Sequence, residues 1–179
     1  MKLRTHDLVN IHLPRWEEFP AFELYIDQVI SFINENLAVF IRDDEALITT
    51  SMINNYVKNG ALPAPIKKKY NREHLAKLIV ICIGKRMLSL SELSEAIATM
   101  SRSFEVSKGY NVFCDELEYE VLSAFAPDEY PPRTILSSDS RDVAALRSLA
   151  SAVAKILVFD RLQSQRKRLS AVVMRNIKK

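Results

Sequence analysis

Scarce glycine and clustered proline limit the fold of this chain more than any other feature. Only three of its 179 residues are glycine, at positions 60, 84 and 109. The prolines fall at 14 and 20, at 63 and 65, at 127, and at 131 and 132. Tight β-hairpins draw on glycine for positive φ, whereas helices accept proline near their ends. We therefore predict an all-α protein whose helices are separated by the prolines.

A helix, a stiff basic loop and a second helix are predicted between residues 47 and 93. Hydroxyl side chains that can cap a helix stand at 49–51, and apolar residues then recur with helical spacing up to Val57. Gly60 ends this helix, because a residue without Cβ takes a left-handed turn at no steric cost. Pro63 and Pro65 then hold the next residues extended, which places three consecutive lysines on a stiff arm.

The second helix is predicted from Arg72 to Arg86, with Asn71 as its N-cap. Its apolar run 78–83 is also compatible with a buried strand, and periodicity does not separate the two. The N-cap favours a helix. A Ser89-x-x-Glu92 capping box opens a further helix that we expect to run to about residue 100.

This stretch resembles the helix-turn-helix of MerR-type transcriptional regulators. In that family a recognition helix ends in a tyrosine, a few residues and glycine, and a proline-rich basic turn leads to a tyrosine before the next helix. The matching positions are Tyr56, Gly60, Pro63, Pro65, Lys67 to Lys69, Tyr70 and Ser89 to Leu93. The segments MINNYVKNG and KKKYNREHLAKLIVIC are similar, more closely, to small bacterial proteins grouped as domain of unknown function 1836, which are taken to be MerR-like. The resemblance also supports the helical interpretation of residues 72–86.

The resemblance implies a DNA-binding function and names the residues that would carry it. The helix from Thr50 to Asn59 would enter the major groove, where Asn can form two hydrogen bonds with adenine and Lys can reach guanine acceptors. The basic arm and the start of the next helix would hold phosphates. The predicted DNA-binding residues are Thr50, Ser51, Asn54, Asn55, Lys58, Lys67, Lys68, Lys69, Tyr70, Arg72 and Lys77.

The net charge of +3 conceals a strong segregation of charge. Residues 48–90 hold eight Lys or Arg and a single acid, Glu73, whereas residues 105–142 hold nine Asp or Glu and three basic residues. The last nineteen residues, 161–179, carry seven basic residues and no acid. Such separation is typical of a nucleic-acid-binding face, although a charge run is more often a solvated surface.

Three further segments complete the predicted helices. We expect a first helix from Pro20 to about Phe40, a loop over residues 101–110, and an acidic helix over residues 111–125. The acidic helix is interpreted as a solvated face, or as a partner for basic surface elsewhere. The first helix would bury the stripe Phe22, Tyr25, Ile26, Val29, Ile30, Ile33, Leu37 and Phe40, and the acidic helix would expose Asp115, Glu116, Glu118 and Glu120.

The C-terminal region contains no Gly or Pro from about residue 139 to 177, so one long helix is predicted there. Val143, Leu146, Ala150, Val153 and Leu157 recur at spacings of three and four. This seam either pairs with a second subunit, as the dimerisation helix of MerR-like regulators does, or lies across the protein's own core, in which case the helix could break near Ser164. We divide the chain into a DNA-binding domain, 1–104, and a C-terminal dimerisation or regulatory region, 105–179.

The sequence also indicates what the protein does not do. It has no phosphate-cradling Gly-rich loop, GxSxG elbow or HExxH motif, so we expect no enzyme, no cofactor and no metal. Cys82 and Cys114 are interpreted as buried free thiols and His74 as solvent-facing. Without an apolar leader or a span of membrane length, a cytoplasmic protein is expected.

The function predicted from the sequence is therefore bacterial transcription regulation by a homodimer that binds double-stranded DNA. The first alternative is a helical protein-interaction adaptor, in which the basic loop meets an acidic partner. The second is a ligand sensor, in which the helices after Ser89 enclose an apolar cavity for a small-molecule effector.

Overall fold

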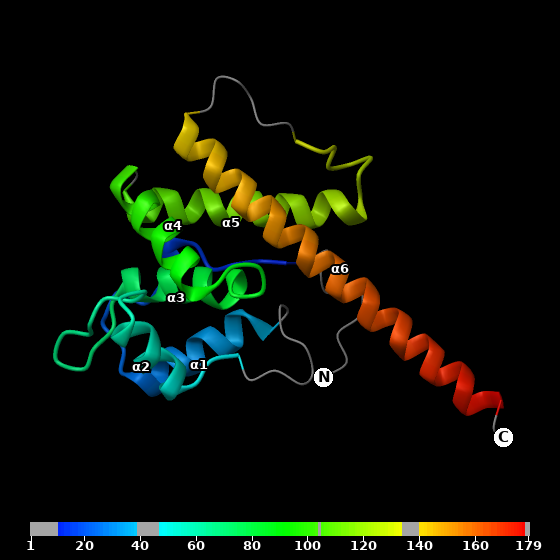
Figure 1. Ribbon diagram of the computed structural model, residues 1–179, viewed down its shortest axis with the longest axis horizontal. Helices are drawn as coiled ribbons and strands as arrows, with labels where there is room; N and C mark the ends of the chain where they lie inside the picture. Colours follow the sequence, from blue (N-terminus) through cyan, green and yellow to red (C-terminus); the bar gives the residue numbers. More distant parts are fainter. Residues whose placement is uncertain (1–10, 39–46, 104, 134–139, 178–179) are drawn as a thin grey trace.

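The computed structural model of the chain describes residues 11–38, 47–103, 105–133 and 140–177, without the side chains of Ser103 and of residues 164–177. Helices dominate these ranges (Figure 1), and the predicted all-α class is confirmed. Within them, extended pairing is limited to two isolated bridges, Leu24 with Tyr70 and Ile66 with Lys69. The elements are η2 (Trp16–Glu18), α1 (Ile26–Asn36), α2 (Thr50–Lys58), α3 (Arg72–Gly84), α4 (Leu90–Ser103), α5 (Val106–Phe125) and α6 (Arg141–Ile177).

Helix α3 lies at the centre of the protein. Nine of its thirteen residues are buried, and it packs against α1, α4 and α5. This central position explains why residues 78–83 are apolar on all sides, as a fully enclosed helix must be. Gly84 permits the close approach of α4, because a Cβ at this position would lie 2.6 Å from Cδ2 of Leu93.

Helices α5 and α6 form the most extensive contact in the fold (Figure 1). The seam residues Leu146, Ala150, Val153 and Leu157 are buried in the hydrophobic core of the same chain. For this stretch, the interpretation that the helix covers the protein's own core is therefore confirmed. Helix α6 continues unbroken through Ser164 and extends beyond α5 toward the C-terminus. Its predicted N-cap, near residue 139, lies outside the described residues.

The predicted start of the first helix is wrong. Helix α1 begins at Ile26, and the side chains of Phe22 and Tyr25 are 68% and 54% exposed. The backbone of Leu24 exchanges two hydrogen bonds of 2.8 Å with Tyr70, which holds this segment extended beyond the point at which Pro20 could start a helix. The predicted end near Phe40 lies outside the described residues.

The predicted loop over residues 101–110 is also wrong. Helix α4 continues to Ser103 and α5 begins at Val106, so that Gly109 lies buried within α5. Glycine costs a helix about 1 kcal/mol relative to alanine. The burial of Tyr110 and Phe113 on the same helix outweighs that cost.

The N-terminal segment crosses from α5 to α1 and binds the two parts together. Both guanidinium Nη atoms of Arg15 contact the carboxylate of Glu118, at 2.8 and 2.6 Å, and the backbone N–H of Leu13 donates to the same carboxylate. The Tyr110 hydroxyl donates to the carbonyl oxygen of Pro14 at 2.8 Å. We refer to residues 13–19 as the N-terminal strap. It joins residues on either side of the domain boundary predicted at 104.

The acidic face of α5 is only partly solvated: the predicted exposure of Glu116 and Glu118 is wrong, whereas the alternative that the acids pair with basic groups elsewhere is confirmed for these two. Glu116 is 5% exposed, and its Oε2 lies 3.2 Å from Nη1 of Arg133 and 3.5 Å from Nε of Arg147. Glu118 is bound by Arg15. These two acids serve as partners for basic groups of the same chain, and the more exposed Asp115 also contacts Arg15, at 2.8 Å. Among the described helices, none combines the length and apolarity that crossing a membrane requires.

Candidate nucleic-acid interface

Helix α2 presents one apolar and one polar face, as predicted. The Thr49 hydroxyl caps the helix by accepting the backbone N–H of Met52 at 3.3 Å. Ile53 and Tyr56 are buried against the core. On the opposite side the polar residues are all exposed: Thr50, Ser51, Asn54, Asn55 and Lys58.

The amides of α2 remain able to bind a further partner. The Asn55 oxygen Oδ1 accepts a hydrogen bond of 2.9 Å from the side-chain amide of Asn59. An amide oxygen can accept two hydrogen bonds, and the NH₂ group of Asn55 is a separate donor. The exposed Asn55 therefore retains the acceptor and donor that pairing with a base edge needs.

Gly60 ends α2 in the left-handed conformation, with φ of 74°. The backbone N–H groups of Ala61 and Leu62 then bond to the carbonyl of Tyr56, at 2.9 and 3.1 Å, and both side chains are buried. The predicted role of Gly60 is confirmed. The chain is thereby anchored before it reaches the lysines.

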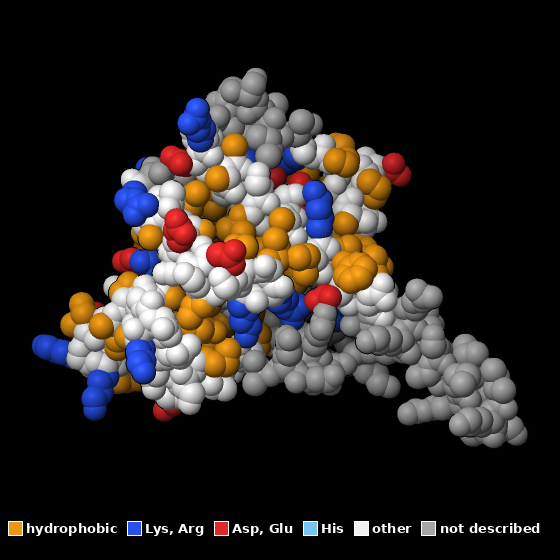
Figure 2. Space-filling model, viewed as in Figure 1, with side chains coloured by type: hydrophobic (Ala, Val, Ile, Leu, Met, Phe, Trp, Pro, Cys, Tyr) orange, Lys and Arg blue, Asp and Glu red, His pale blue; other side chains and the backbone are white. Residues whose placement is uncertain are grey.

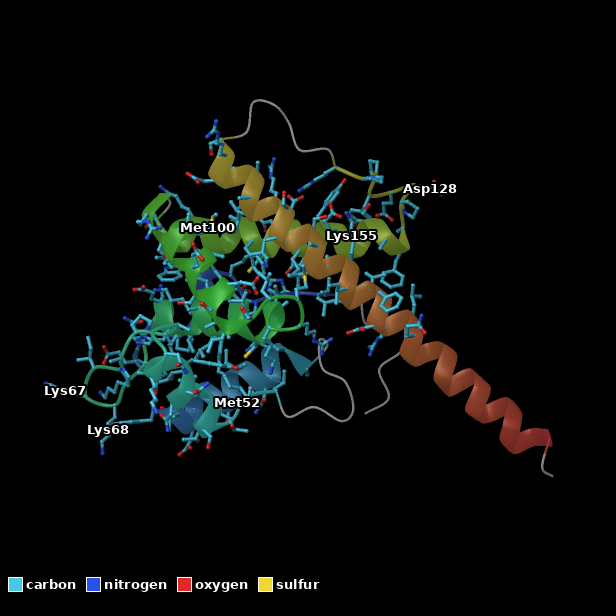
Figure 3. The ribbon with its side chains drawn as sticks, in the orientation of Figure 1. Met52, Lys67, Lys68, Met100, Asp128 and Lys155 are labelled. Atoms are coloured by element: carbon cyan, nitrogen blue, oxygen red, sulfur yellow. The ribbon has the colours of Figure 1, made fainter. Side chains whose placement is uncertain are left out.

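Three lysines lie in a tight turn over residues 66–69, which we call the basic turn. Ile66 and Lys69 exchange backbone hydrogen bonds of 3.1 and 2.9 Å. Between them Lys67 and Lys68 both have positive φ, 50° and 65°, as in a type I′ turn. Both side chains are exposed and point outward from the loop (Figure 3).

The basic turn is attached to the start of α1. The Lys69 ammonium lies 5.7 Å from the ring centroid of Tyr25, and the next residue, Tyr70, pairs with Leu24. Ile66 is 63% exposed, so apolar side chains flank the lysines at this edge of the protein (Figure 2). Sequence reasoning missed this contact with Tyr25, because residues so far apart in the chain carry no local signal of proximity.

Three of the predicted DNA-binding residues have side chains that are buried or bonded within the protein, where they hold the basic turn and the start of α3 in place. Tyr70 is 3% exposed, its ring lies edge-on to that of His74, and burial raises the pKa of its hydroxyl. The Arg72 guanidinium donates to the carbonyl oxygens of Phe19 and Pro20, at 3.1 and 3.2 Å. Lys77 forms an ion pair of 2.7 Å with Glu73.

The prediction that His74 faces solvent is wrong. The residue is 4% exposed in the first turn of α3, where its ring contacts that of Tyr70. Its Nδ1 accepts the backbone N–H of Asn71 at 3.1 Å, and the Asn71 side chain caps α3 in return. Burial lowers the pKa of the His74 imidazole. The neutral His74 ring therefore helps to support the basic turn, by packing against Tyr70.

Cys82 and Cys114 are free and buried, as predicted. Burial raises the pKa of each thiol to about 12. Neither is therefore suited to act as a thiolate nucleophile near neutral pH. In the part of the chain that the structure describes, no cluster of His, Cys, Asp and Glu is arranged to hold a metal.

The family described as "Domain of unknown function (DUF1836)" matches residues 14–113. No curated protein and no solved structure matches the chain. The matched stretch is more than half of the sequence. It includes α2, the basic turn and the residues that support them. The chain therefore belongs to the DUF1836 family.

Proposed function

We propose that this protein is a transcriptional regulator that reads double-stranded DNA with a MerR-like helix-turn-helix. In this proposal α2 is the recognition helix and the basic turn lies beside it on the DNA backbone. One observation carries the proposal: every polar residue predicted to face DNA from α2 is exposed, and an exposed two-lysine turn follows the same helix.

Base recognition would come from the amides and the lysine of α2. Asn54 and Asn55 suit adenine, and Lys58 suits the acceptors of guanine. A well-placed bidentate pair discriminates against the wrong base by about 1–3 kcal/mol. Two such residues on one helix are enough to favour a short sequence, which a second half-site would extend.

Phosphate binding would come chiefly from Lys67 and Lys68, with Lys69 beside them. Each phosphate that a lysine neutralises releases condensed counterions, which makes affinity fall as salt is raised. Tyr70, Arg72 and Lys77 would then act as supports that hold the turn and α3 in place, because their side chains are buried or already bonded.

In this proposal the protein is still a homodimer formed through α6, but the two copies contact each other through a different part of that helix. The seam up to Leu157 is covered by α5, so a partner would have to use the part of α6 beyond it. Phe159 and Leu162, which are exposed at the start of that part, favour such a contact. The adaptor alternative loses one argument, because Glu116 and Glu118 already pair within the chain.

The decisive experiment is fluorescence anisotropy of a labelled duplex, first selected from a random pool, over a series of salt concentrations. Changing Lys67, Lys68 and Lys69 together to alanine should weaken binding to all sequences. It should also flatten the slope of log K against log salt by about 0.9 for each phosphate that is no longer neutralised. Asn55→Ala should instead change the preference among sequences and leave the slope unaltered.

A matched control is available on the far side of the molecule. Lys108 and Lys155 are exposed lysines outside the proposed interface, and Figure 3 shows Lys155 on α6, distant from the basic turn. Changing both to alanine removes charge without touching α2. If this control weakened binding as much per lysine removed as the triple variant did, attraction by the net charge alone would explain the binding and the proposed interface would be rejected.

A further inference from the structure

A small apolar cavity lies where α3, α4, α5 and α6 meet. It opens to the surface, has a volume of about 70 Å³ and is lined by Ala76, Ala96, Met100, Gly109, Phe113 and Leu146 among others. Hydrophobic side chains gather over this part of the surface (Figure 2), and Met100 lies there at the end of α4 (Figure 3). Ser101, which is exposed, forms part of its rim.

The cavity exists because small residues stand where larger ones would fill it. Ala76, Ala96 and Gly109 approach it from three different helices. A well-packed core leaves few voids larger than a water molecule, since an unfilled apolar void forfeits contacts. About one water-sized group fits in each 10–15 Å³ of such space, so roughly five to seven non-hydrogen atoms can enter. The atoms that line the cavity are almost all carbon.

Among the described residues that line the cavity, Lys77 is the one with a charge. Its side chain is mostly buried, and its ammonium forms the 2.7 Å ion pair with Glu73. A ligand whose apolar part fills the cavity would meet, at the edge, an ammonium that is already paired with Glu73, so an acidic ligand would have to share or displace that carboxylate. A carboxylate is the complementary group, because a charge-assisted bond to an ammonium is among the stronger polar contacts.

We propose that this cavity binds a small branched-chain or aromatic carboxylate. The alkyl group or ring occupies the space between Ala96 and Gly109, and the carboxylate meets Lys77. The fit of an apolar cavity to a ligand of only a few carbon atoms carries this inference.

The same cavity is connected to the proposed DNA interface. Tyr110 lines it, and the hydroxyl of Tyr110 holds Pro14 of the N-terminal strap. The strap ends at Phe19, whose carbonyl accepts from Arg72 at the start of α3. A ligand that shifts α5 relative to α3 therefore acts on the helix that follows the basic turn. This regulatory part rests on the proposed function, whereas ligand binding itself does not.

Thermal unfolding of the full-length protein tests the binding. Isovalerate and benzoate should each raise the midpoint by a few degrees at ten times their dissociation constants, and isovaleramide and benzamide should do so less. Ala96→Leu should abolish the shift, because its side chain fills the cavity. Ala98→Leu, on the exposed side of α4, should leave the shift unchanged. Lys77→Met should remove the preference for the carboxylate over the amide.

Ala96→Val provides a milder filling, should the leucine variant not fold. An undiminished response to isovalerate in a folded Ala96 variant would overturn the cavity as the site. Equal responses to acid and amide in the wild type would overturn the role of Lys77.

Anisotropy with labelled duplex tests the regulatory part separately: a shifted DNA affinity on adding isovalerate supports it, and an unchanged affinity refutes it. Thermal stabilisation by isovalerate without any DNA binding would refute the proposed function and leave the ligand site intact.

Discussion

Lys67 and Lys68 occupy a backbone conformation that lysine rarely adopts. Both have positive φ, and the left-handed conformation costs a residue with a side chain about 1 kcal/mol or more. Asn-Gly is the sequence that a type I′ turn prefers. Local strain that persists in a fold is most often found at functional sites. Two strained lysines at an exposed tip are therefore consistent with selection for charge at the expense of stability.

This interpretation predicts opposite effects on stability and binding. Replacing Lys67 with Asn and Lys68 with Gly should raise the free energy of unfolding by about 1 kcal/mol, because the strain is relieved. The same change should weaken binding to duplex DNA. Urea denaturation and anisotropy measure the two quantities, and a Lys67→Arg, Lys68→Arg variant controls for charge. Unchanged DNA affinity in the Asn-Gly variant would show that the basic turn is not part of the DNA interface.

His74 predicts a dependence of stability on pH. Burial is the main cause that lowers its pKa in the folded protein; Glu73 opposes the shift and Lys77 adds to it. A histidine with a lowered folded pKa contributes its full stability above the unfolded value of about 6.5 and loses it as pH falls below that value. The free energy of unfolding of wild type should therefore drop more between pH 7 and pH 5 than that of His74→Gln. Parallel pH profiles for the two proteins would show that His74 is not the group responsible.

At the scale of elements, the N-terminal strap joins α5 to the half of the protein that contains α2 and the basic turn. Its main polar contact is the two-point pair between Arg15 and Glu118, and this carboxylate raises the pKa of Arg15. Both side chains are largely shielded from water, at 22% and 13% exposure. Removing one partner should thus cost more than it does in a surface ion pair and less than it does in a fully buried one.

A double-mutant cycle measures this contact. Glu118→Gln should lower the free energy of unfolding by about 2 kcal/mol, because it leaves the half-buried Arg15 with only the exposed Asp115 as a charged partner. Adding Arg15→Met should then cost less than Arg15→Met alone, since the guanidinium has already lost its bond to Glu118 and keeps only those to Asp115 and Leu13. The readout is urea denaturation of the wild type, the two single variants and the double variant. Strictly additive single effects would show that the two side chains are not coupled.

At the scale of the whole molecule, α6 changes character along its length. Its first part is buried against α5, whereas the sequence from 161 to 179 carries seven basic residues and no acid. Two copies that pair through this region bring like charges together. Salt screens such repulsion, with a Debye length of about 8 Å at physiological ionic strength.

The proposed dimer and the proposed DNA complex should therefore respond to salt in opposite directions. Self-association through α6 should strengthen as sodium chloride is raised, while DNA binding weakens. Sedimentation velocity at low and high salt measures the first effect, and a Phe159→Ser, Leu162→Ser variant should abolish it. A dimer that dissociates on adding salt would indicate an interface of opposite charges, away from the end of α6.

Local features of the sequence were sufficient to predict much of this protein. The all-α class, the ends of α2 and the continuous α6 follow from capping residues, glycine and periodicity, which act over a few neighbouring residues. The same holds for the caps of α3 and α4: Asn71 accepts the backbone N–H of His74, and Ser89 and Glu92 bond each other's backbone N–H groups. The exposed polar face of α2 follows for the same reason, because a helix with one apolar side can bury only that side.

Only the tertiary structure decided which charged and polar residues remain exposed. The late start of α1 depends on Leu24 pairing with Tyr70, and the burial of Glu116 depends on Arg133 and Arg147. The guanidinium of Arg72 donates its hydrogen bonds to the carbonyl oxygens of residues 19 and 20. Each of these partners is distant in sequence, or lies on another element, and is brought close only when the helices pack. Helix formation depends on neighbours along the chain, whereas the accessibility of a side chain depends on what the completed fold places against it.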